Sequence, residues 1–425
     1  MIGPADVLQR TTLLVRDHLQ GDSAERAVAK AFSDSTVGVI VNATMMEHRG
    51  FVVALECLRV LLAGMCVGMR LEVRGQDRGI ALKAPFRNCH WLDALGEYRE
   101  GACASLSLGS LGSGCISRIG LGVSNDRLDY ELAADESSFW LTSSGRPAAW
   151  HRASIWSGAG SAILAAAEVY KRILIEFRSE LRPDPDFGQV RDFRIAVNDA
   201  NPARVPKHID VVSAGAITNA VIFLLIRTGQ RVSVSVWDDD IFRVDNLNRY
   251  PLFDLQHLNM LKVDALAGLA GPSLTVTPQR RKFDSAESIS GSVVMVGADR
   301  VAPRWEIARR RPPISVIGAT DHYLTLDSIH RVGRGGCPAC LHQHGDDVDA
   351  LVPTVSFVSF AAGLEAAMSL ADSSPGESRY ALTRTWLRPD AAMSRLTGAV
   401  PYNPSCPLKC NPSSEGPRSI VGSRP

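Results

Sequence analysis

The stretch VWDDDIFRVDNLNRYPLF, residues 236–253, follows an apolar run that is typical of a buried strand. Three consecutive aspartates, Asp238, Asp239 and Asp240, stand where that strand is expected to end. Adjacent like charges repel one another and lose favourable hydration when they are covered. A solvated surface turn would explain them without any function, so the meaning of the stretch depends on the segments around it.

Expected strands and helices alternate on both sides of the triple aspartate. HIDVVSAG (208–215), RVSVSVWD (231–238), SVVMVGAD (292–299) and ISVIGATD (314–321) have the pattern of buried strands. Helical patterns lie between or after them, at 219–229, 302–311 and 356–370. Such alternation predicts a doubly wound, mostly parallel sheet, whose ligands bind beyond the carboxyl ends of its strands.

The first half of the chain repeats this order. Strands are expected at 37–41, 69–73, 116–123 and 139–143, with a long helix after the first strand and a closing helix at 158–177. We therefore predict an α/β fold of two Rossmann-like halves that arose by internal duplication. The expected boundaries are a first domain at 1–180, a linker at 181–204, a second domain at 205–410 and a disordered tail at 411–425.

Length and charge narrow the class of protein. A chain of 425 residues exceeds the size at which single cores stop growing, which favours two domains. Its 46 basic and 45 acidic residues indicate neither nucleic acid nor a membrane surface as partner. The apolar stretch 50–69 includes Glu56 and Arg59, each of which would cost about 2.5–3.5 kcal/mol at a bilayer centre. No signal-peptide pattern opens the sequence, so we expect a cytoplasmic protein.

The turn after the first strand of the second half is SAGAIT, residues 213–218. Of the three glycines of a dinucleotide fingerprint it has Gly215 alone. Ser213 and Thr218 are small enough to keep a tight turn whose backbone N–H groups could hold a phosphate. An ordinary tight turn explains this segment equally well.

The polar residues that follow favour ATP over NAD. An acidic residue at the second strand end can accept hydrogen bonds from both ribose hydroxyls. Arg249 and Lys262 come next, and two cations suit a triphosphate better than hydride transfer. Asp299 ends the next core strand, where it could hold Mg²⁺ on the phosphates.

The sequence DDDIFRVDNLNRY, with its later lysine and GAD segment, resembles the E1-like adenylating family of ThiF, MoeB and the ubiquitin-activating enzymes. The resemblance covers roughly residues 205–410 and implies two Rossmann-like units that use ATP and Mg²⁺. It implies that the nucleotide is contacted by Gly215, Asp238, Asp240, Asn246, Arg249 and Lys262. Within that set it gives Asp240 to the ribose, Asn246 and Arg249 to the nucleotide and its phosphates, and Lys262 to the phosphates. Asp299 then resembles the magnesium ligand, and Arg249, Lys262 and Asp299 would be the catalytic residues.

Four of the nine cysteines form two close pairs in the second half. The spacing is C-x₂-C at Cys337 and Cys340, and C-x₃-C at Cys406 and Cys410. Two short thiolate pairs from distant segments are typical of a closed, structural Cys₄ zinc site. His342 and His344 are not needed as ligands, and we expect them to be exposed. A redox role for the first pair lacks the strand-to-helix context that lowers a thiol pKa.

Family members that form a thioester do so with a cysteine in the loop after the first zinc pair, but residues 341–357 contain none. Cys103 or Cys115 could serve only if the fold brought one of them across. The first half has neither an acidic strand end nor an N-L-x-R segment, so we expect a degenerate copy that replaces the second subunit of a homodimer. By the resemblance, Arg10 or Arg16 in its N-terminal segment would reach the ATP site, although a solvated arginine on an amphipathic helix is the simpler explanation of each.

These observations give one leading hypothesis and three alternatives. The chain is expected to be an ATP-dependent adenylyltransferase that acts on the C-terminal carboxylate of a ubiquitin-like or sulfur-carrier protein. The same site could instead act on a biosynthetic precursor peptide with a free C-terminus, and the missing loop cysteine favours that reading. A non-catalytic ThiF-like scaffold would fit the incomplete glycine loop. An NAD oxidoreductase is disfavoured by the arginine and the lysine.

Overall fold

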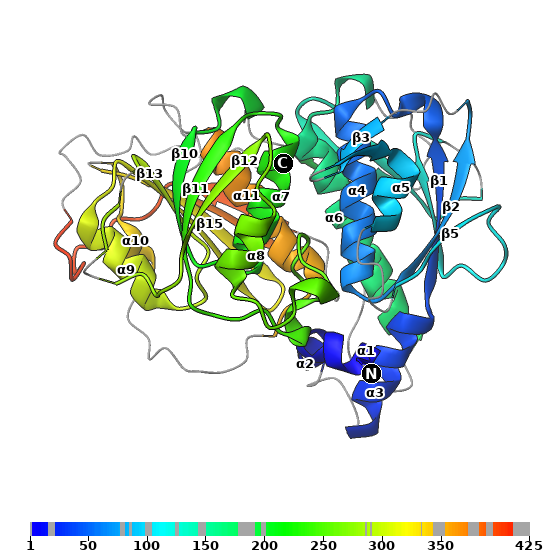
Figure 1. Cartoon of the computed structure of the whole chain (residues 1–425), viewed down its shortest axis with the longest axis horizontal. Coiled ribbons are helices and arrows are strands. Elements are labelled where there is room, and N and C mark those ends of the chain that lie inside the picture. The colour runs from blue at the N-terminus through cyan, green and yellow to red at the C-terminus, as the bar shows by residue number, and fades with distance from the viewer. Residues whose placement is uncertain are drawn as a thin grey trace.

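The computed structural model of the chain has two halves, each built on one large sheet (Figure 1). The structure describes residues 2–15, 22–76, 81–84, 87–97, 104–123, 127–142, 150–176, 192–196, 201–284, 287–289, 291–332, 334–342, 353–372, 382–387 and 394–410. Arg16, Cys103, His344 and the predicted tail at 411–425 lie outside these residues. No described helix is long and apolar enough to cross a membrane.

The N-terminal half has a seven-stranded sheet in the order β5-β2-β1-β6-β7-β8-β9. Its strands are β1 (Thr36–Asn42), β2 (Gly68–Arg74), β5 (Leu106–Leu108), β6 (Ser117–Leu121), β7 (Tyr130–Ala134), β8 (Ser138–Thr142) and β9 (Asp192–Ala196), beside a hairpin of β3 (Ala81–Ala84) and β4 (Arg87–His90). Its helices are α1 (Pro4–Val7), α2 (Gln9–Val15), α3 (Asp22–Asp34), α4 (Arg49–Gly64), α5 (Trp91–Glu97) and α6 (Ile155–Glu176).

The C-terminal half has an eight-stranded sheet in the order β12-β11-β10-β13-β14-β15-β16-β17. Its strands are β10 (His208–Val212), β11 (Val232–Trp237), β12 (Leu274–Gln279), β13 (Val293–Val296), β14 (Ile314–Asp321), β15 (Leu324–Arg331), β16 (Leu382–Trp386) and β17 (Ser394–Gly398). Its helices are α7 (Ala216–Arg227), α8 (Lys262–Gly268), α9 (Val301–Arg310), α10 (Pro338–Leu341) and α11 (Ser356–Ala371).

The two sheets share one topology. In each, five parallel strands are followed by antiparallel ones, and the first strand in sequence lies at the centre, between the second and the fourth. The chain therefore reverses its direction across the sheet beside β1 in one half and beside β10 in the other. In an open α/β sheet, that reversal marks the place where ligands bind. The predicted pair of Rossmann-like halves is confirmed.

Helices from both halves pack against each other between the sheets (Figure 1). Gly50 in α4 and Gly158 in α6 allow these two helices to approach closely, because a Cβ at either position would overlap the backbone opposite. Arg227 of α7 donates from Nε to Glu56 of α4 at 2.8 Å, and both side chains are buried. The side chains of both halves form one continuous apolar core.

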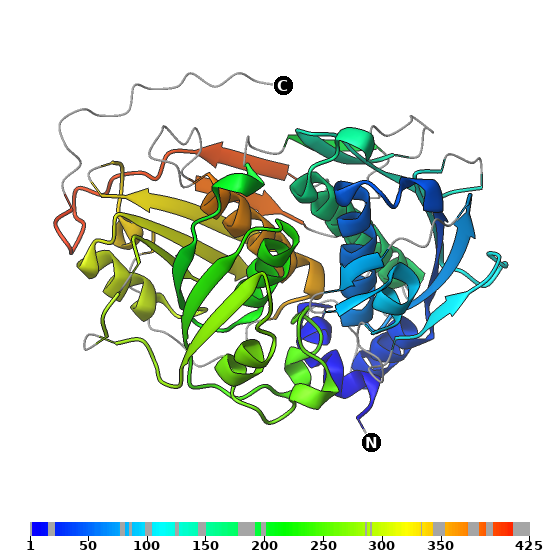
Figure 2. The same cartoon turned by 45° about the horizontal axis from the view of Figure 1, so that its top comes forward.

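Two details of the chain path differ from the sequence-based expectation. The expected linker, 181–204, contains β9, which pairs with β8 at the edge of the N-terminal sheet. β15, β16 and β17 extend the C-terminal sheet as antiparallel strands that the pattern did not indicate. The first helices, α1 and α2, lie beside the segment that follows β11, at the junction of the halves (Figure 2).

Candidate nucleotide site and zinc centre

The turn between β10 and α7 is shaped to accept an anion. Ser213 has a positive φ of 78°, and Gly215 is the N-cap of α7 without a side-chain cap. Thr218 closes the turn by donating from Oγ1 to the carbonyl oxygen of Ser213 at 2.6 Å. A Cβ on Gly215 would come within 3.4 Å of the carbonyl oxygen of Gly297, which follows β13. The first N–H groups of a helix have no intrahelical partner, so they are available to a phosphate here.

Asp238 ties the end of β11 to that turn. Its carboxylate accepts hydrogen bonds from the backbone N–H of Ala214 at 2.7 Å and of Asp240 at 2.8 Å, and from Ser213 Oγ at 3.3 Å. The side chain is buried, and burial raises the pKa of Asp238 despite Lys262 and these donors. Asp238 therefore stabilises the turn between β10 and α7 by accepting these hydrogen bonds. Its predicted contact with the nucleotide stays a prediction.

Asp240 and Lys262 form an ion pair at the same strand end. Lys262 Nζ lies 2.8 Å from Asp240 Oδ2, and the N–H of Lys262 donates to the carbonyl oxygen of Asp240. Burial disfavours the charged form of both groups. The pairing with Lys262 nevertheless lowers the pKa of Asp240. The pKa of Lys262 is raised by its neighbours Tyr250, Asp238 and Asp240. The Asp240 side chain is 67% exposed, whereas that of Lys262 is 9% exposed. Asp240 is thus open to solvent while it pairs with the lysine, and its predicted contact with the ribose stays a prediction.

Asp239 lies outside this pair. It is exposed, and its carboxylate lies 3.8 Å from Lys282 Nζ. The three carboxylates, Asp238, Asp239 and Asp240, still offer oxygens within 4.8 Å of one another. The Asp238 carboxylate already accepts hydrogen bonds from backbone N–H groups, and Asp240 is paired with Lys262. The three aspartates therefore do not resemble a dedicated metal-binding site.

The segment after β11 buries Arg249 beside the strand ends. The Arg249 guanidinium donates from Nη1 to the carbonyl oxygen of Asp245 at 2.6 Å and to Asn248 Oδ1 at 2.8 Å. Burial lowers its pKa, the charge of Arg10 adds to that effect, and the charges of Asp245 and Asp299 oppose it. These influences place Arg10, Arg249 and Asp299 in one electrostatic neighbourhood.

Asn246 has a structural role that the sequence did not reveal. Its Oδ1 accepts the N–H of Arg243 at 3.0 Å and so caps the short 3-10 turn η6 (Val244–Asn246). Asn248, which had no predicted role, is fully buried and donates from Nδ2 to Thr11 Oγ1 at 3.1 Å. One asparagine of the DNLNRY segment therefore shapes the turn, and the other fastens it to the N-terminal helix.

Arg10 lies beside Asp245 and near Arg249, and its predicted contact with the nucleotide stays a prediction. Its Nε donates to Asp245 Oδ2 at 3.1 Å, and the N–H of Thr354 donates to its carbonyl oxygen. Its side chain is 17% exposed, so it is not a solvated helix residue. Asp245 joins the two arginines: its carboxylate faces Arg10 and its carbonyl oxygen faces Arg249.

Asp299 follows β13 and is exposed at the carboxyl edge of the sheet. No hydrogen bond or ion pair joins its carboxylate to another described residue. Its charge nevertheless acts on Arg249, so the two residues lie in one electrostatic neighbourhood. An exposed carboxylate has the donor chemistry that Mg²⁺ uses on nucleotides.

The four cysteines of the second half converge at one point. Cys337 Sγ lies 3.9 Å from Cys340 Sγ and 3.6 Å from Cys406 Sγ, and Cys340 Sγ lies 3.2 Å from Cys410 Sγ. These separations are close to those between sulfurs that share one tetrahedral ion at about 2.3 Å. Trp305 and Ala308 of α9 pack against the cluster. The four residues fit a closed zinc site, which would hold the C-terminal segment against α9.

His342 is not exposed, contrary to the sequence-based expectation. Its Nδ1 faces Arg304 Nη1 at 3.0 Å, and burial with the charge of Arg304 lowers the pKa of His342 to about 3. Arg304 also donates to the carbonyl oxygen of Ala298, next to Asp299. This arginine, which the sequence reading missed, connects the cysteine centre to the strand end that carries Asp299.

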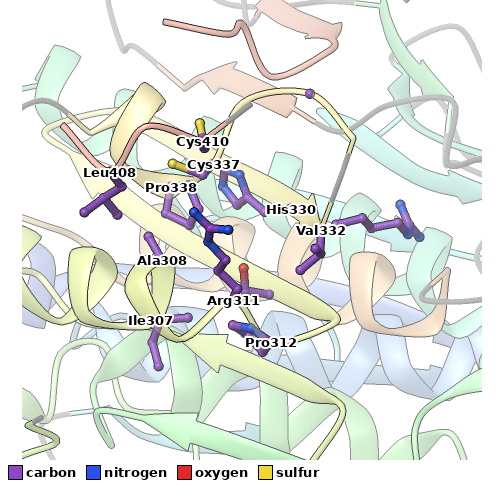
Figure 3. A pocket seen from close by; sticks show the side chains of 13 residues that line it. Ile307, Ala308, Arg311, Pro312, His330, Val332, Cys337, Pro338, Leu408 and Cys410 are labelled. Atoms are coloured by element: carbon purple, nitrogen blue, oxygen red, sulfur yellow. The ribbon is translucent and has the colours of Figure 1, made fainter. Parts of the chain in front are cut away.

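A cavity of about 170 Å³ lies beside the cysteine cluster. Figure 3 shows Cys337 and Cys410 at one end of it, with Ile307 and Pro312 at the other. His330 borders the cavity and donates from Nδ1 to the carbonyl oxygen of Gly336, and burial lowers its pKa to about 4. The histidine is therefore neutral and supports the loop that begins the zinc pair.

No protein-family model matches this chain, and no curated protein matches it either. Solved structures of E. coli MccB do. MccB alone is 13% identical with a TM-score of 0.39 over 70% of this chain and 97% of its own. MccB with ATP is 14% identical with a TM-score of 0.41, and MccB with the MccA peptide is 14% identical with a TM-score of 0.40; each covers 67% of this chain and 98% of the neighbour.

The likeness is remote and assigns no role to any residue of this chain.

Proposed function

We propose that this protein adenylates a carboxylate with ATP. The observation that carries the proposal is a group of cations at the carboxyl edge of the sheet: Arg249 lies near Arg10 and Asp299. Lys262, which pairs with Asp240, shares the Tyr250 ring with Arg249, at 5.9 and 5.5 Å from its centroid. Such a set neutralises a triphosphate and leaves one carboxylate for the ribose and one for a divalent ion. Hydride transfer requires none of these cations.

The reaction follows from the placement of these groups. A substrate carboxylate oxygen attacks the α-phosphorus of ATP, the bond from that phosphorus to the bridging oxygen breaks, and pyrophosphate leaves. Arg249 and Lys262, both largely buried, stabilise the negative charge that develops on the phosphate oxygens. Mg²⁺, held on the phosphates by Asp299, would neutralise the leaving pyrophosphate. The turn at Gly215 positions the phosphates against the N-terminus of α7.

The pairing of Lys262 with Asp240 orients both groups before ATP arrives. An exposed carboxylate that already holds the lysine with one oxygen can accept ribose hydroxyls with the other. The same ion pair fixes the ammonium group at the strand end, so less side-chain freedom is lost on binding. Arg10 contributes from the other half of the chain, which is why the halves must stay docked for the site to be complete.

We propose a peptide with a free C-terminal carboxylate as the substrate class, in preference to a ubiquitin-like or sulfur-carrier protein. No cysteine occurs in residues 341–357, and the four second-half cysteines converge on one another. Cys57 is buried in the core, and burial raises its pKa, so it is no nucleophile either. The adenylate would therefore pass directly to another nucleophile. MccB has been solved with a peptide, MccA, which gives a first kind of substrate to test.

Substrate-dependent exchange of labelled pyrophosphate into ATP tests the proposal. We expect exchange with peptides that end in a free carboxylate and none with the same peptides amidated. Asp299→Ala should abolish exchange, whereas Asp34→Ala, which removes an exposed acid from α3, should not change it. Exchange with a Gly-tailed carrier protein alone would favour the carrier substrate. Failure to bind ATP in calorimetry would indicate a non-catalytic scaffold.

A further inference from the structure

Arg304 of α9 is buried between the strand end that carries Asp299 and the segment that carries the first two cysteines of the zinc centre. The residue is only 6% exposed, although its guanidinium stays charged at any pH that a folded protein tolerates. Because the guanidinium is covered, it cannot lie against a bound nucleotide. Any effect of Arg304 on the nucleotide site must therefore pass through the groups that it holds.

The guanidinium holds the peptide that precedes Asp299. Its Nη2 donates to the carbonyl oxygen of Ala298 at 2.8 Å. The residue before, Gly297, donates its N–H to the carbonyl oxygen of Val212 in β10 at 3.1 Å, and a Cβ on it would lie 2.7 Å from Thr218 Oγ1. The segment after β13 is thus fixed to the turn between β10 and α7 on one side and to the guanidinium on the other. A charge-assisted hydrogen bond at this point restrains the backbone that carries the Asp299 carboxylate.

The same guanidinium is tied to the segment of the cysteine cluster. Its Nη1 lies 3.0 Å from His342 Nδ1, and because arginine can only donate, Nδ1 accepts. The neighbouring Trp305 Nε1 donates to the carbonyl oxygen of His342 at 2.7 Å, which gives α9 a second bond to that residue. His342 directly follows α10, which includes Cys340 and lies beside α9 (Figure 1).

These two attachments favour a role in orientation over one in packing. Burying a charge costs free energy that an apolar side chain of similar size would not cost. The guanidinium is planar and rigid, so the N–H group that meets His342 and the N–H group that meets Ala298 move together. A displacement of the cysteine segment would therefore displace the donor that restrains the peptide before Asp299.

We propose that Arg304 is a positioning residue that sets how strongly Asp299 holds the Mg²⁺ of bound ATP, an inference that rests on the proposed function. The cysteine cluster then acts on the nucleotide site through His342 and Arg304, in addition to its part in stability. Groups that orient a metal ligand typically change metal affinity by roughly 10–100-fold when they are removed.

Calorimetric titration of the full chain with ATP, with and without Mg²⁺ and without peptide, tests the inference in the absence of turnover. In the wild type we expect Mg²⁺ to strengthen ATP binding. Arg304→Met keeps most of the side-chain volume and removes both donors, so it should reduce that gain by roughly tenfold. The affinity for ATP without Mg²⁺ should stay unchanged, whereas a merely structural role would weaken both affinities alike. Arg304→Lys keeps a charged donor and should restore part of the gain.

A double variant shows whether Arg304 acts through Asp299. Asp299→Ala should abolish the gain from Mg²⁺, and Arg304→Met should then have no further effect in that background. His342→Ala removes one of the two attachments and should reduce the gain less than Arg304→Met does. Arg26→Met removes an exposed arginine of α3 and should change neither affinity.

Equal weakening of ATP binding with and without Mg²⁺ in a folded Arg304→Met protein would overturn the inference. A further loss from Arg304→Met in the Asp299→Ala background would overturn it as well. If Arg304→Met does not fold, Arg304→Lys and His342→Ala decide by the same comparison.

The failure of the inference can be told apart from that of the proposed function. Wild-type ATP binding that Mg²⁺ does not strengthen would overturn the inference together with the magnesium role of Asp299. Mg²⁺-dependent ATP binding without pyrophosphate exchange would refute the adenylation proposal alone.

Discussion

The two halves have one strand order and different strand ends. In the C-terminal half, β11 leads into Asp238, which accepts the N–H of Ala214 and shapes the turn before α7. At the matching place in the N-terminal half, β2 ends at Arg74, whose guanidinium forms an ion pair with Glu72 of the same strand. β1 ends at Asn42, whose side chain caps its own next turn through Thr44. The same topology thus carries the proposed nucleotide site at the strand ends of one half and no matching set among the described residues of the other, because function depends on a few side chains at strand ends.

Among the described residues, the cluster of four cysteines that could hold zinc lies in the C-terminal half, and its loss should have the largest effect on stability. Cys340→Ser should remove much of the binding free energy that a structural zinc site adds to folding, about 10–16 kcal/mol in isolated sites. Cys115→Ser, a half-buried cysteine of the other half, is the matched control. Zinc content by mass spectrometry and thermal unfolding with and without a chelator measure the difference. Equal melting temperatures of the two variants would refute a structural zinc.

The contact between the halves provides the next largest effect. Glu56→Gln should leave Arg227 buried without its counter-charge and cost about 3–5 kcal/mol. Lys30→Ala breaks an exposed pair in α3 and should cost less than about 0.5 kcal/mol. Urea unfolding followed by fluorescence gives both values. Two separate transitions in the wild-type chain would mean that the halves unfold independently and do not share one cooperative core.

A buried acid on β15 should make stability depend on pH in the C-terminal half. Burial raises the pKa of Asp327 to about 8. The hydrogen bond from Ser369 lowers this pKa in part, the charge of Glu365 of α11 raises it, and the charge of Arg395 of β17 lowers it. The folded chain then keeps a proton that the unfolded chain releases near pH 4. Stability is therefore expected to fall as pH rises from 4 to 8, by at most about 1.4 kcal/mol per pH unit.

Asp327→Asn should remove that slope, because the amide does not titrate. Chemical denaturation at several pH values between 5 and 8 measures it. The corresponding antiparallel strand of the other half, β8, has no acid in its sequence SFWLT. A slope that persists unchanged in the variant would show that another group causes it.

The smallest expected effect concerns the tether from the first helices to the nucleotide site. Thr11→Val should cost about 1 kcal/mol, and Asn248→Ala more, because it also removes the acceptor of Arg249 Nη1. Both changes together should cost little more than Asn248→Ala alone, because the two side chains share one hydrogen bond. Hydrogen exchange of residues 4–15 should accelerate in both variants. Strictly additive losses would show that this hydrogen bond does not couple the two segments.

Much of the fold could be predicted from the sequence because apolar runs of strand length alternate with helical patterns. β10, β11, β13 and β14 lie where the pattern indicated. β15 and β16 did not show in the pattern, since buried polar residues such as Thr325, Asp327 and Thr383 interrupt their hydrophobic signal. β9 lies in a polar stretch, where only the pairing with β8 reveals a strand.

The resemblance assigned Asp240 and Lys262 to one site, and the structure pairs the two side chains, whereas the other partners of the site residues were not predicted. The cap formed by Asn246, the link through Asp245 and the contact of Arg304 with His342 depend on how loops close in space. Asp, Asn and Arg occur on every surface, so sequence alone could not separate these from solvated residues.

The central claim is that the cations at the carboxyl edge of the C-terminal sheet promote transfer of the adenylyl group. The most direct test is peptide-dependent ATP–pyrophosphate exchange by Lys262→Ala, compared with Lys30→Ala as the surface control. Loss of a buried group that stabilises transition-state charge predicts a rate lower by roughly 10²–10³-fold in Lys262→Ala, with no change in the control. Exchange at the wild-type rate in a folded Lys262→Ala protein would contradict the account.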